Sequence, residues 1–307
     1  MENLINSSNS KNDQRKKIKQ PLTLIAAALL LLTTACHREE GTATVRVHLS
    51  GFTVEQEEFP GTRSAVDPAG YDPVTAITLA FYGSTGYEAY KVTQYKGNLP
   101  QGEIFGEFEL ELPVGNYTMV AVAYAYNNGD VFTLTSPTSA GYSTERPRET
   151  FCKTQAVTVS STAPLDLDVT LSRIVSRLAV NSTDGRPAEA TKIRTTYSKG
   201  GKSFNPTTGL ALSDNGFSQI NNPSAAAGNS ITVSSFPFLY SDEETMTITL
   251  EALDANDNVL ITKTIPNVPF KRNRTTILTG AVYTAGSSDF GIKLETDWLT
   301  PLNPINF

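Results

Sequence analysis

The sequence is poor in the residues on which most catalytic and metal sites depend. Its 307 residues include two cysteines, two histidines and one tryptophan. Two cysteines cannot build a disulfide framework, and so few Cys and His residues do not form a typical zinc site. The sequence also has no glycine-rich phosphate loop, paired-histidine motif or Gly-x-Ser-x-Gly elbow. We therefore expect no catalytic residue, metal or cofactor.

Positive charge is also scarce. The chain has 25 Lys and Arg against 31 Asp and Glu, a net charge of −6. Residues 1–35 hold five basic and two acidic side chains, so residues 36–307 carry 20 positive against 29 negative groups, a net charge of −9. A phosphate backbone is bound by clustered Lys and Arg, so nucleic acid is not an expected partner.

The N-terminal segment is typical of an export signal. Basic residues 15–19 precede the apolar run 22–32, which is shorter than the about 20 residues that a membrane-spanning helix needs. The run ends in Leu-Thr-Thr-Ala-Cys, which resembles a bacterial lipobox. This resemblance predicts cleavage between Ala35 and Cys36 and lipid attachment to Cys36. The alternative is a soluble exported protein whose Cys36 is incidental.

The chain beyond residue 41 is expected to be all-β. Its apolar residues alternate with polar ones in short runs that are bounded by Gly, Pro, Asn or Asp. The first run predicts a strand with one buried face, formed by Ala43, Val45, Val47 and Leu49. Residues 74–82, 103–112 and 117–126 repeat the pattern. Turn residues predict hairpins at 112–117 and at 254–258.

The length predicts two domains. Residues 36–307 number 272, which two β-sandwiches of about 100–150 residues would account for. Alternating strands on both sides of residue 172 place the boundary there. The expected parts are a signal peptide at 1–35, a lipidated pro-segment at 36–63, and sandwiches at 64–172 and 173–307.

These features, taken in order, resemble the fimbrillins of Bacteroidetes, which build pili from secreted lipoprotein precursors. The resemblance spans the lipobox, the strands at 43–49 and 76–82, and the segments 171–178 and 271–280. It implies two stacked transthyretin-like β-sandwich domains. It also implies that a surface arginine-specific protease cuts the lipid-anchored precursor and removes its first strand.

Carried over to this sequence, the removed strand is 42–52 and the cut falls between Arg63 and Ser64. Arg63 follows Pro-Gly in an expected loop, whereas the competing Arg46 lies within the predicted strand, where a protease cannot bind an extended chain. The alternative for Arg63 is an ordinary loop charge.

The strand that replaces the removed one in a neighbouring subunit is expected near the C-terminus. In an extended strand, one face of this segment is apolar and fits a groove, because its even-numbered positions include Phe290, Ile292, Leu294 and Trp298. Alternation is equally consistent with the last strand of the chain's own domain.

The resulting hypothesis is a surface fimbrial subunit that supports adhesion or biofilm growth. Its expected partners are other fimbrial subunits, the protease, and the outer membrane through the lipid. One alternative is an anchor or tip subunit that keeps its lipid. Another is a monomeric glycan-binding surface lipoprotein, which would use tyrosines of the first half: Tyr71, Tyr82, Tyr87, Tyr90, Tyr95, Tyr124 and Tyr126.

Overall fold

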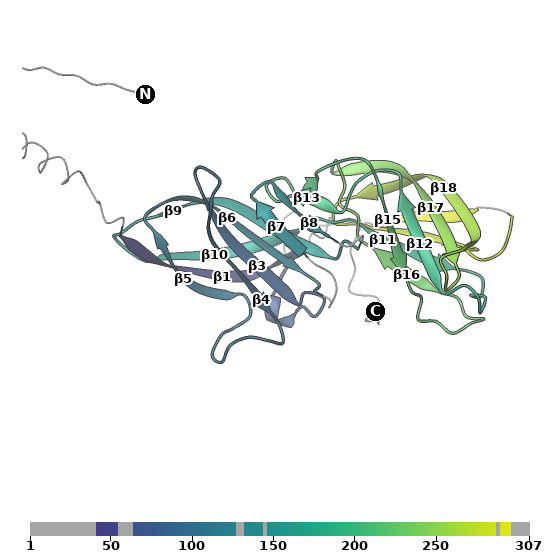
Figure 1. The fold of residues 1–307 in the computed structure, drawn as a ribbon, viewed down its shortest axis with the longest axis horizontal. Helices are drawn as coiled ribbons and strands as arrows, with labels where there is room; N and C mark the ends of the chain where they lie inside the picture. The colour runs from purple at the N-terminus through teal and green to yellow at the C-terminus, as the bar shows by residue number, and fades with distance from the viewer. Residues whose placement is uncertain (1–40, 55–63, 127–131, 144–145, 287–288, 296–307) are drawn as a thin grey trace, which may run out of the picture. The chain divides into compact units, whose positions relative to one another are not determined.

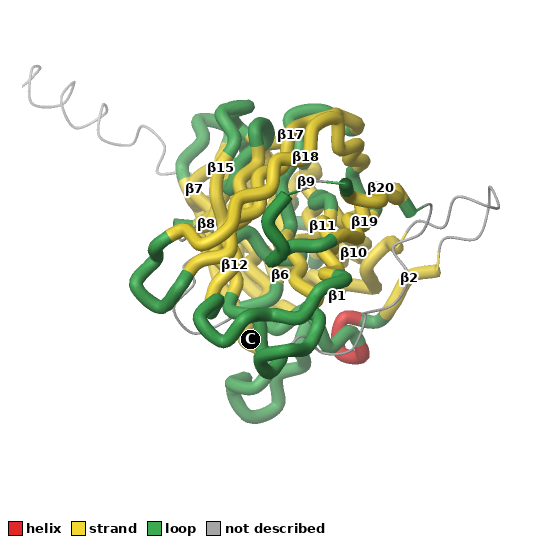
Figure 2. Tube along the Cα trace, turned by 90° about the vertical axis from the view of Figure 1, so that its right-hand side faces the viewer, coloured by secondary structure: helices red, strands yellow, loops and turns green. Residues whose placement is uncertain are grey.

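The computed structural model describes residues 41–295 except 55–63, 127–131, 144–145 and 287–288. Within these ranges the chain forms twenty strands and a single 3₁₀ helix, η1 at Pro68–Gly70, drawn in red in Figure 2. The predicted all-β fold is therefore confirmed (Figure 1). No helix among the described residues is long and apolar enough to cross a membrane.

The first sheet forms a sandwich around its own core. Its order is β2-β1-β10-β9-β6-β3-β4, and β5 also pairs with β1. Inward-facing side chains of six strands, among them Val47, Leu79 and Met119, make one buried cluster. The strands are β1 (Thr42–Val54), β2 (Ser64–Val66), β3 (Ala76–Gly83), β4 (Glu88–Tyr95), β5 (Glu107–Pro113), β6 (Gly115–Tyr124), β9 (Thr150–Val159) and β10 (Leu165–Arg173).

Two four-stranded sheets enclose a second core, which includes Leu178, Ile248 and Leu278. One sheet has the order β16-β11-β19-β20 and the other β15-β12-β17-β18. Their strands are β11 (Arg177–Ser182), β12 (Lys192–Tyr197), β15 (Phe217–Asn221), β16 (Thr232–Ser235), β17 (Glu243–Leu253), β18 (Val259–Lys271), β19 (Thr275–Gly280) and β20 (Phe290–Leu294).

A fourth sheet combines strands from both sides of residue 172. It has the order β14-β13-β8-β7, from β7 (Phe132–Ser136), β8 (Ser139–Tyr142), β13 (Ser203–Asn205) and β14 (Leu210–Ala211). Its side chains pack on those of β3 and β6 that point away from the first core. The domain division at 172 stays a prediction, because the described residues all belong to one unit, Gly41–Phe307.

This fourth sheet corrects one expectation. The alternation at 74–82 and 117–126 predicts strands with one exposed face, but all eight residues of β3 are buried. β6 is likewise buried over its last six residues. A sheet that is covered on both faces needs no polar face, and apolar residues such as Ala76, Ala80 and Val122 form the face of β3 and β6 toward the fourth sheet.

Of the two predicted hairpins, one is confirmed and one is wrong. β17 and β18 pair antiparallel around residues 254–258, where the Asp254 carboxylate accepts hydrogen bonds from the backbone of Asn256 and Asn258. The turn at 112–117 joins β5 to β6, but β5 pairs with β1 and β6 pairs with β3 and β9. The turn therefore carries the chain from one layer of the sandwich to the other.

Candidate functional site

The first strand of the chain, β1, lies between partners on both of its edges. β10 runs parallel to it, with Val45 opposite Leu165 and Thr53 opposite Ser172. On the other edge, β5 pairs antiparallel with residues 42–48, and β2 pairs with residues 52–54. A strand that is paired on both edges contributes two ladders of backbone hydrogen bonds, so its removal would leave an open groove in the sheet.

The inner face of β1 is deeply buried. Val45, Val47, Leu49 and Phe52 expose at most 2% of their surface, and Ala43 packs against the same core. The predicted alternation of this strand is therefore confirmed. The buried side chains continue beyond residue 49 because β1 extends to Val54, two residues farther than the predicted removable segment.

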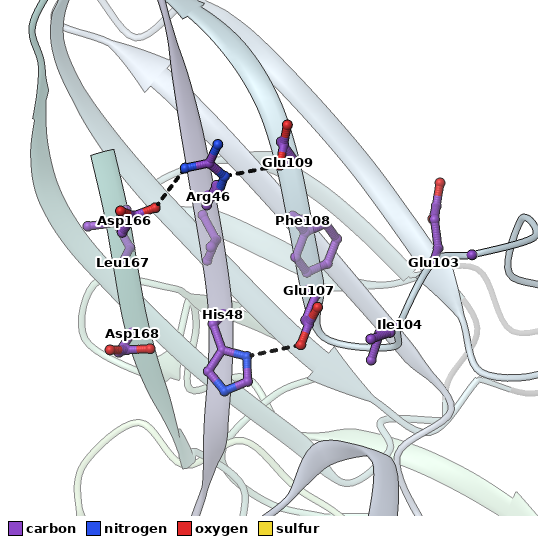
Figure 3. Close-up of a pocket in the computed structure, with 12 residues that line it drawn as sticks. Arg46, His48, Glu103, Ile104, Glu107, Phe108, Glu109, Asp166, Leu167 and Asp168 are labelled. Carbon is purple, nitrogen blue, oxygen red and sulfur yellow. Dashed lines mark hydrogen bonds and ion pairs between the residues drawn. The ribbon is translucent and has the colours of Figure 1, made fainter. Parts of the chain in front are cut away.

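The outer face of β1 carries a ladder of charged side chains (Figure 3). The Arg46 guanidinium lies 3.1 Å from a carboxylate oxygen of Glu109 on β5 and 3.4 Å from one of Asp166 on β10. These hydrogen bonds, first to Glu109 and then to Asp166, raise the pKa of Arg46. Two residues along, His48 Nδ1 lies 3.7 Å from Glu107 and His48 is opposite Asp168.

We name these two rows by their central residue. The Arg46 rung is Asp166–Arg46–Glu109, and the His48 rung is Asp168–His48–Glu107. Both rungs line an open depression of about 440 Å³ on the outer face, together with Gly102, Glu103 and Ile104. In each rung β1 supplies the basic group, and its two neighbours supply carboxylates.

The residues predicted for export and processing lie mostly outside the described residues. Ala35, Cys36 and Arg63 are in this category. Ser64 begins β2, which pairs only with the end of β1 among the described strands. The competing Arg46 lies inside a strand that is paired on both edges, as the sequence predicts.

The predicted donor segment forms β20, at the edge of its sheet. It pairs with β19 only, within the described part of the chain. Phe290 is half-buried, but Ile292 and Leu294 expose 41% and 37% of their surface. Trp298 lies outside the described residues. In this structure the segment is the last described strand of its own sheet, and its donation to a neighbour stays a prediction.

A buried polar network near the end of β10 was not anticipated from the sequence. Arg173 donates to the Glu149 carboxylate at 2.8 Å, to Asn273 at 2.7 Å and to the Tyr71 hydroxyl at 3.0 Å. Burial, and next the charge of Glu149, raises the pKa of Tyr71. This network joins residues on both sides of position 172, where the sequence indicates only a strand end.

The described residues do not form a recognisable metal centre. Among the residues that the structure describes, no three His, Cys, Asp or Glu side chains are grouped closely enough to hold an ion. The one described thiol, Cys152, is buried, and burial raises its pKa to about 12. The strongest structural candidate for function is thus the groove that β1 occupies.

Residues 42–304 match a family described as "Family of unknown function (DUF6562)". The chain belongs to this family. No curated protein matches the sequence significantly. The family match begins at the first residue of β1 and includes β20, so both elements of the candidate site lie within it.

Several solved structures that are similar to this family member share little sequence with it. The fimbrial anchor protein Mfa2 from Porphyromonas gingivalis is 10% identical with a TM-score of 0.49, over 83% of this chain and 98% of that one. A candidate cell adhesion protein from Bacteroides ovatus is 14% identical with a TM-score of 0.49, over 85% and 99%. The tip fimbrial protein Mfa3 from Porphyromonas gingivalis, truncated at its C-terminus, is 14% identical with a TM-score of 0.39, over 84% and 100%. All three TM-scores are below 0.5, so none of these likenesses identifies a function for this chain.

Proposed function

We propose that this chain is the precursor of a surface fimbrial subunit, in which proteolysis removes β1 and a strand of a neighbouring subunit takes its place. One observation carries the proposal. β1 is deeply integrated in the sheet, yet it is the first described strand, so a single cut between β1 and β2 separates it from the rest of the chain. A cut after Arg63 leaves Ser64 as the new N-terminus, at the start of β2.

The energetics support replacement rather than an empty groove. Burying one large apolar side chain contributes about 1.5–3 kcal/mol, so the four inner residues of β1 together contribute about 6–12 kcal/mol. They are Val45, Val47, Leu49 and Phe52. Whole domains are stable by only about 5–15 kcal/mol, so a trimmed subunit is marginal until another strand fills the groove. Insertion of an extended segment between two strand edges is an established mode of recognition.

The candidate donor is β20 with the residues that follow it. Phe290, Ile292 and Leu294 repeat the spacing of Val45, Val47 and Leu49. Because β20 pairs with one strand among the described residues, its release breaks that ladder, whereas its insertion in place of β1 forms two. The precursor is anchored through lipid on Cys36 at the outer membrane before the cut. An anchor or tip subunit would instead keep Cys36 and β1.

The test is the N-terminus and oligomeric state of cell-surface material. A shaft subunit should begin at Ser64 and run as an SDS-resistant ladder, whereas an intact lipidated Cys36 identifies an anchor. Arg63→Lys should block trimming by an arginine-specific protease, and the matched variant Arg46→Lys should be trimmed normally. Trimming that depends on Arg46 instead would refute the assigned cut, and a trimmed monomer with no tendency to assemble would refute strand exchange.

One observation favours a second candidate function. The rings of Tyr95 and Tyr126 lie 4.8 Å apart, and these residues expose 37% and 39% of their surface. An exposed aromatic pair can stack on sugar rings. In a monomeric glycan-binding protein, Tyr95→Ala would abolish binding on a glycan array, whereas in a fimbrial shaft subunit it would change neither trimming nor ladders.

A further inference from the structure

Carboxylates flank β1 on both of its edges. The Arg46 rung and the His48 rung place two acidic side chains on β10, Asp166 and Asp168, and two on β5, Glu109 and Glu107. The basic side chains between them, Arg46 and His48, belong to β1. Once β1 leaves, two carboxylates face each other across the groove in each row.

These charges remain close together in the emptied site. Neighbouring strands are about 4.8 Å apart, so the two carboxylates of one row are separated by about 10 Å, which is comparable to the Debye length at physiological salt. An incoming strand that brings an acidic side chain into a row is repelled from both sides. A strand with a basic side chain at the same place gains two attractive neighbours.

We propose, resting on the strand exchange proposed above, that the two rungs select the donor and fix its register. The occupant is segment 290–295 of a second copy of this chain, running in the direction of β1. Its Lys293 takes the place of His48 between Asp168 and Glu107, and Gly291 takes the place of Arg46. Phe290, Ile292 and Leu294 then occupy the places of Val45, Val47 and Leu49.

The alternative registers are disfavoured by burial or by charge. A shift of one residue turns the apolar face of the donor toward solvent. A shift of two residues in one direction brings Glu295 into the His48 rung, and in the other direction brings Asp289 into the Arg46 rung. In the proposed register Glu295 takes the place of Ser50, and Asp289 has a single acidic neighbour, Glu111. The first of these two-residue shifts also brings Lys293 into the Arg46 rung, but it places the acidic Glu295 in the other rung. Only the proposed register combines buried apolar groups with a basic group in one rung and no acidic group in either.

The donor segment presents the required groups in this structure. The Lys293 side chain is 68% exposed and lies 2.7 Å from Glu295, a charged group of the same face. Ile292 and Leu294 are exposed on the same edge strand. None of these side chains needs to leave a buried site before insertion.

The test compares ladders of the full-length chain and its charge variants on the cell surface. Lys293→Glu should reduce assembly on the order of tenfold, because two attractive neighbours become repulsive. High salt should restore part of the loss. Lys199→Glu, which changes the net charge equally at an exposed position of the second half, should assemble as the unaltered chain does. Circular dichroism of the secreted monomers confirms that each variant folds.

Exchanging the charges of Asp168 and Lys293 makes the test specific for the His48 rung. Asp168→Lys should restore ladders to Lys293→Glu, because an opposite pair then forms again in the His48 rung. Undiminished ladders from Lys293→Glu alone, or no rescue by Asp168→Lys, would overturn the proposed register. Deletion of 289–307 distinguishes the proposed register from the proposed strand donation. If the deletion abolishes ladders but Lys293→Glu leaves them intact, only the register is refuted. If ladders persist after the deletion, donation by this segment is refuted.

Discussion

Replacement of Ile292 by alanine should weaken assembly while leaving the subunit itself nearly unchanged. Ile292 exposes 41% of its surface on β20, whereas Val47, whose place it is proposed to take, exposes 1%. Insertion therefore buries roughly 70 Å² of additional apolar surface, which is worth about 1–2 kcal/mol at about 25 cal/mol per Å². Ile292→Ala loses most of that gain, and the assembly constant should fall on the order of tenfold.

The assay is assembly of trimmed, purified subunits, followed by light scattering and by SDS-resistant ladders. Leu260→Ala is a matched control, because Leu260 exposes 40% of its surface on β18 and has no role in the proposed exchange. Both variants should lower the free energy of unfolding of the monomer by about 1 kcal/mol or less. Equal assembly of the two variants would refute the reasoning, because Ile292 would then remain as exposed in the polymer as in the subunit.

Three predictions concern the subunit alone. Arg173→Met should lower the free energy of unfolding by about 3–5 kcal/mol in urea titrations, because the Glu149 carboxylate stays buried without its ion-pair partner, although the Tyr71 hydroxyl still donates to it; a loss below about 1 kcal/mol would contradict this. Burial raises the pKa of Asp184, but hydrogen bonds from Thr284 and the backbone outweigh it and lower the pKa overall. The stability that the Asp184 carboxylate contributes is fully present above the ordinary carboxyl pKa and is lost as the pH falls through the lowered value. Asp184→Asn should therefore lower the Tm more at about pH 7 than at about pH 3; equal losses at the two pH values would contradict this. In a Cys36→Ser background, the buried Cys152 thiol should react with iodoacetamide only after denaturation, and rapid native labelling would refute its burial.

The parts of the fold that follow from local patterns could be predicted from the sequence. The alternation at 43–49 predicts which side chains of β1 are buried, because the side chains of a strand point to opposite faces in turn. The bend at 254–258 is predicted because Asp254 binds its own following backbone groups. Both signals lie within a few residues of the structure that they specify.

The parts that depend on distant partners could not be predicted in this way. Turn residues indicate where β5 ends and β6 begins, but they do not indicate that β5 pairs with β1. The Arg46 rung likewise combines residues that are 63 and 120 positions apart along the chain. The alternation of Asp166 and Asp168 was visible as a strand pattern, but only sheet order brings these carboxylates to either side of β1 with Glu107 and Glu109.

The groove explains why a cut would be needed before exchange. In the precursor, β1 is tethered to the sheet through residues 55–63, and a short tether holds its strand at an effective concentration on the order of millimolar. β1 also fills both rungs with a basic group, whereas the proposed donor fills one with Lys293 and leaves Gly291 in the other. The donor segment therefore competes poorly with β1 for the groove as long as β1 is tethered. The proposed cut would remove the advantage of the tether, and β1 would then dissociate without rebinding at that concentration. The tether and the better electrostatic fit of β1 would thus keep precursors monomeric until processing. Dissociation of β1 after the cut would then make assembly irreversible in practice.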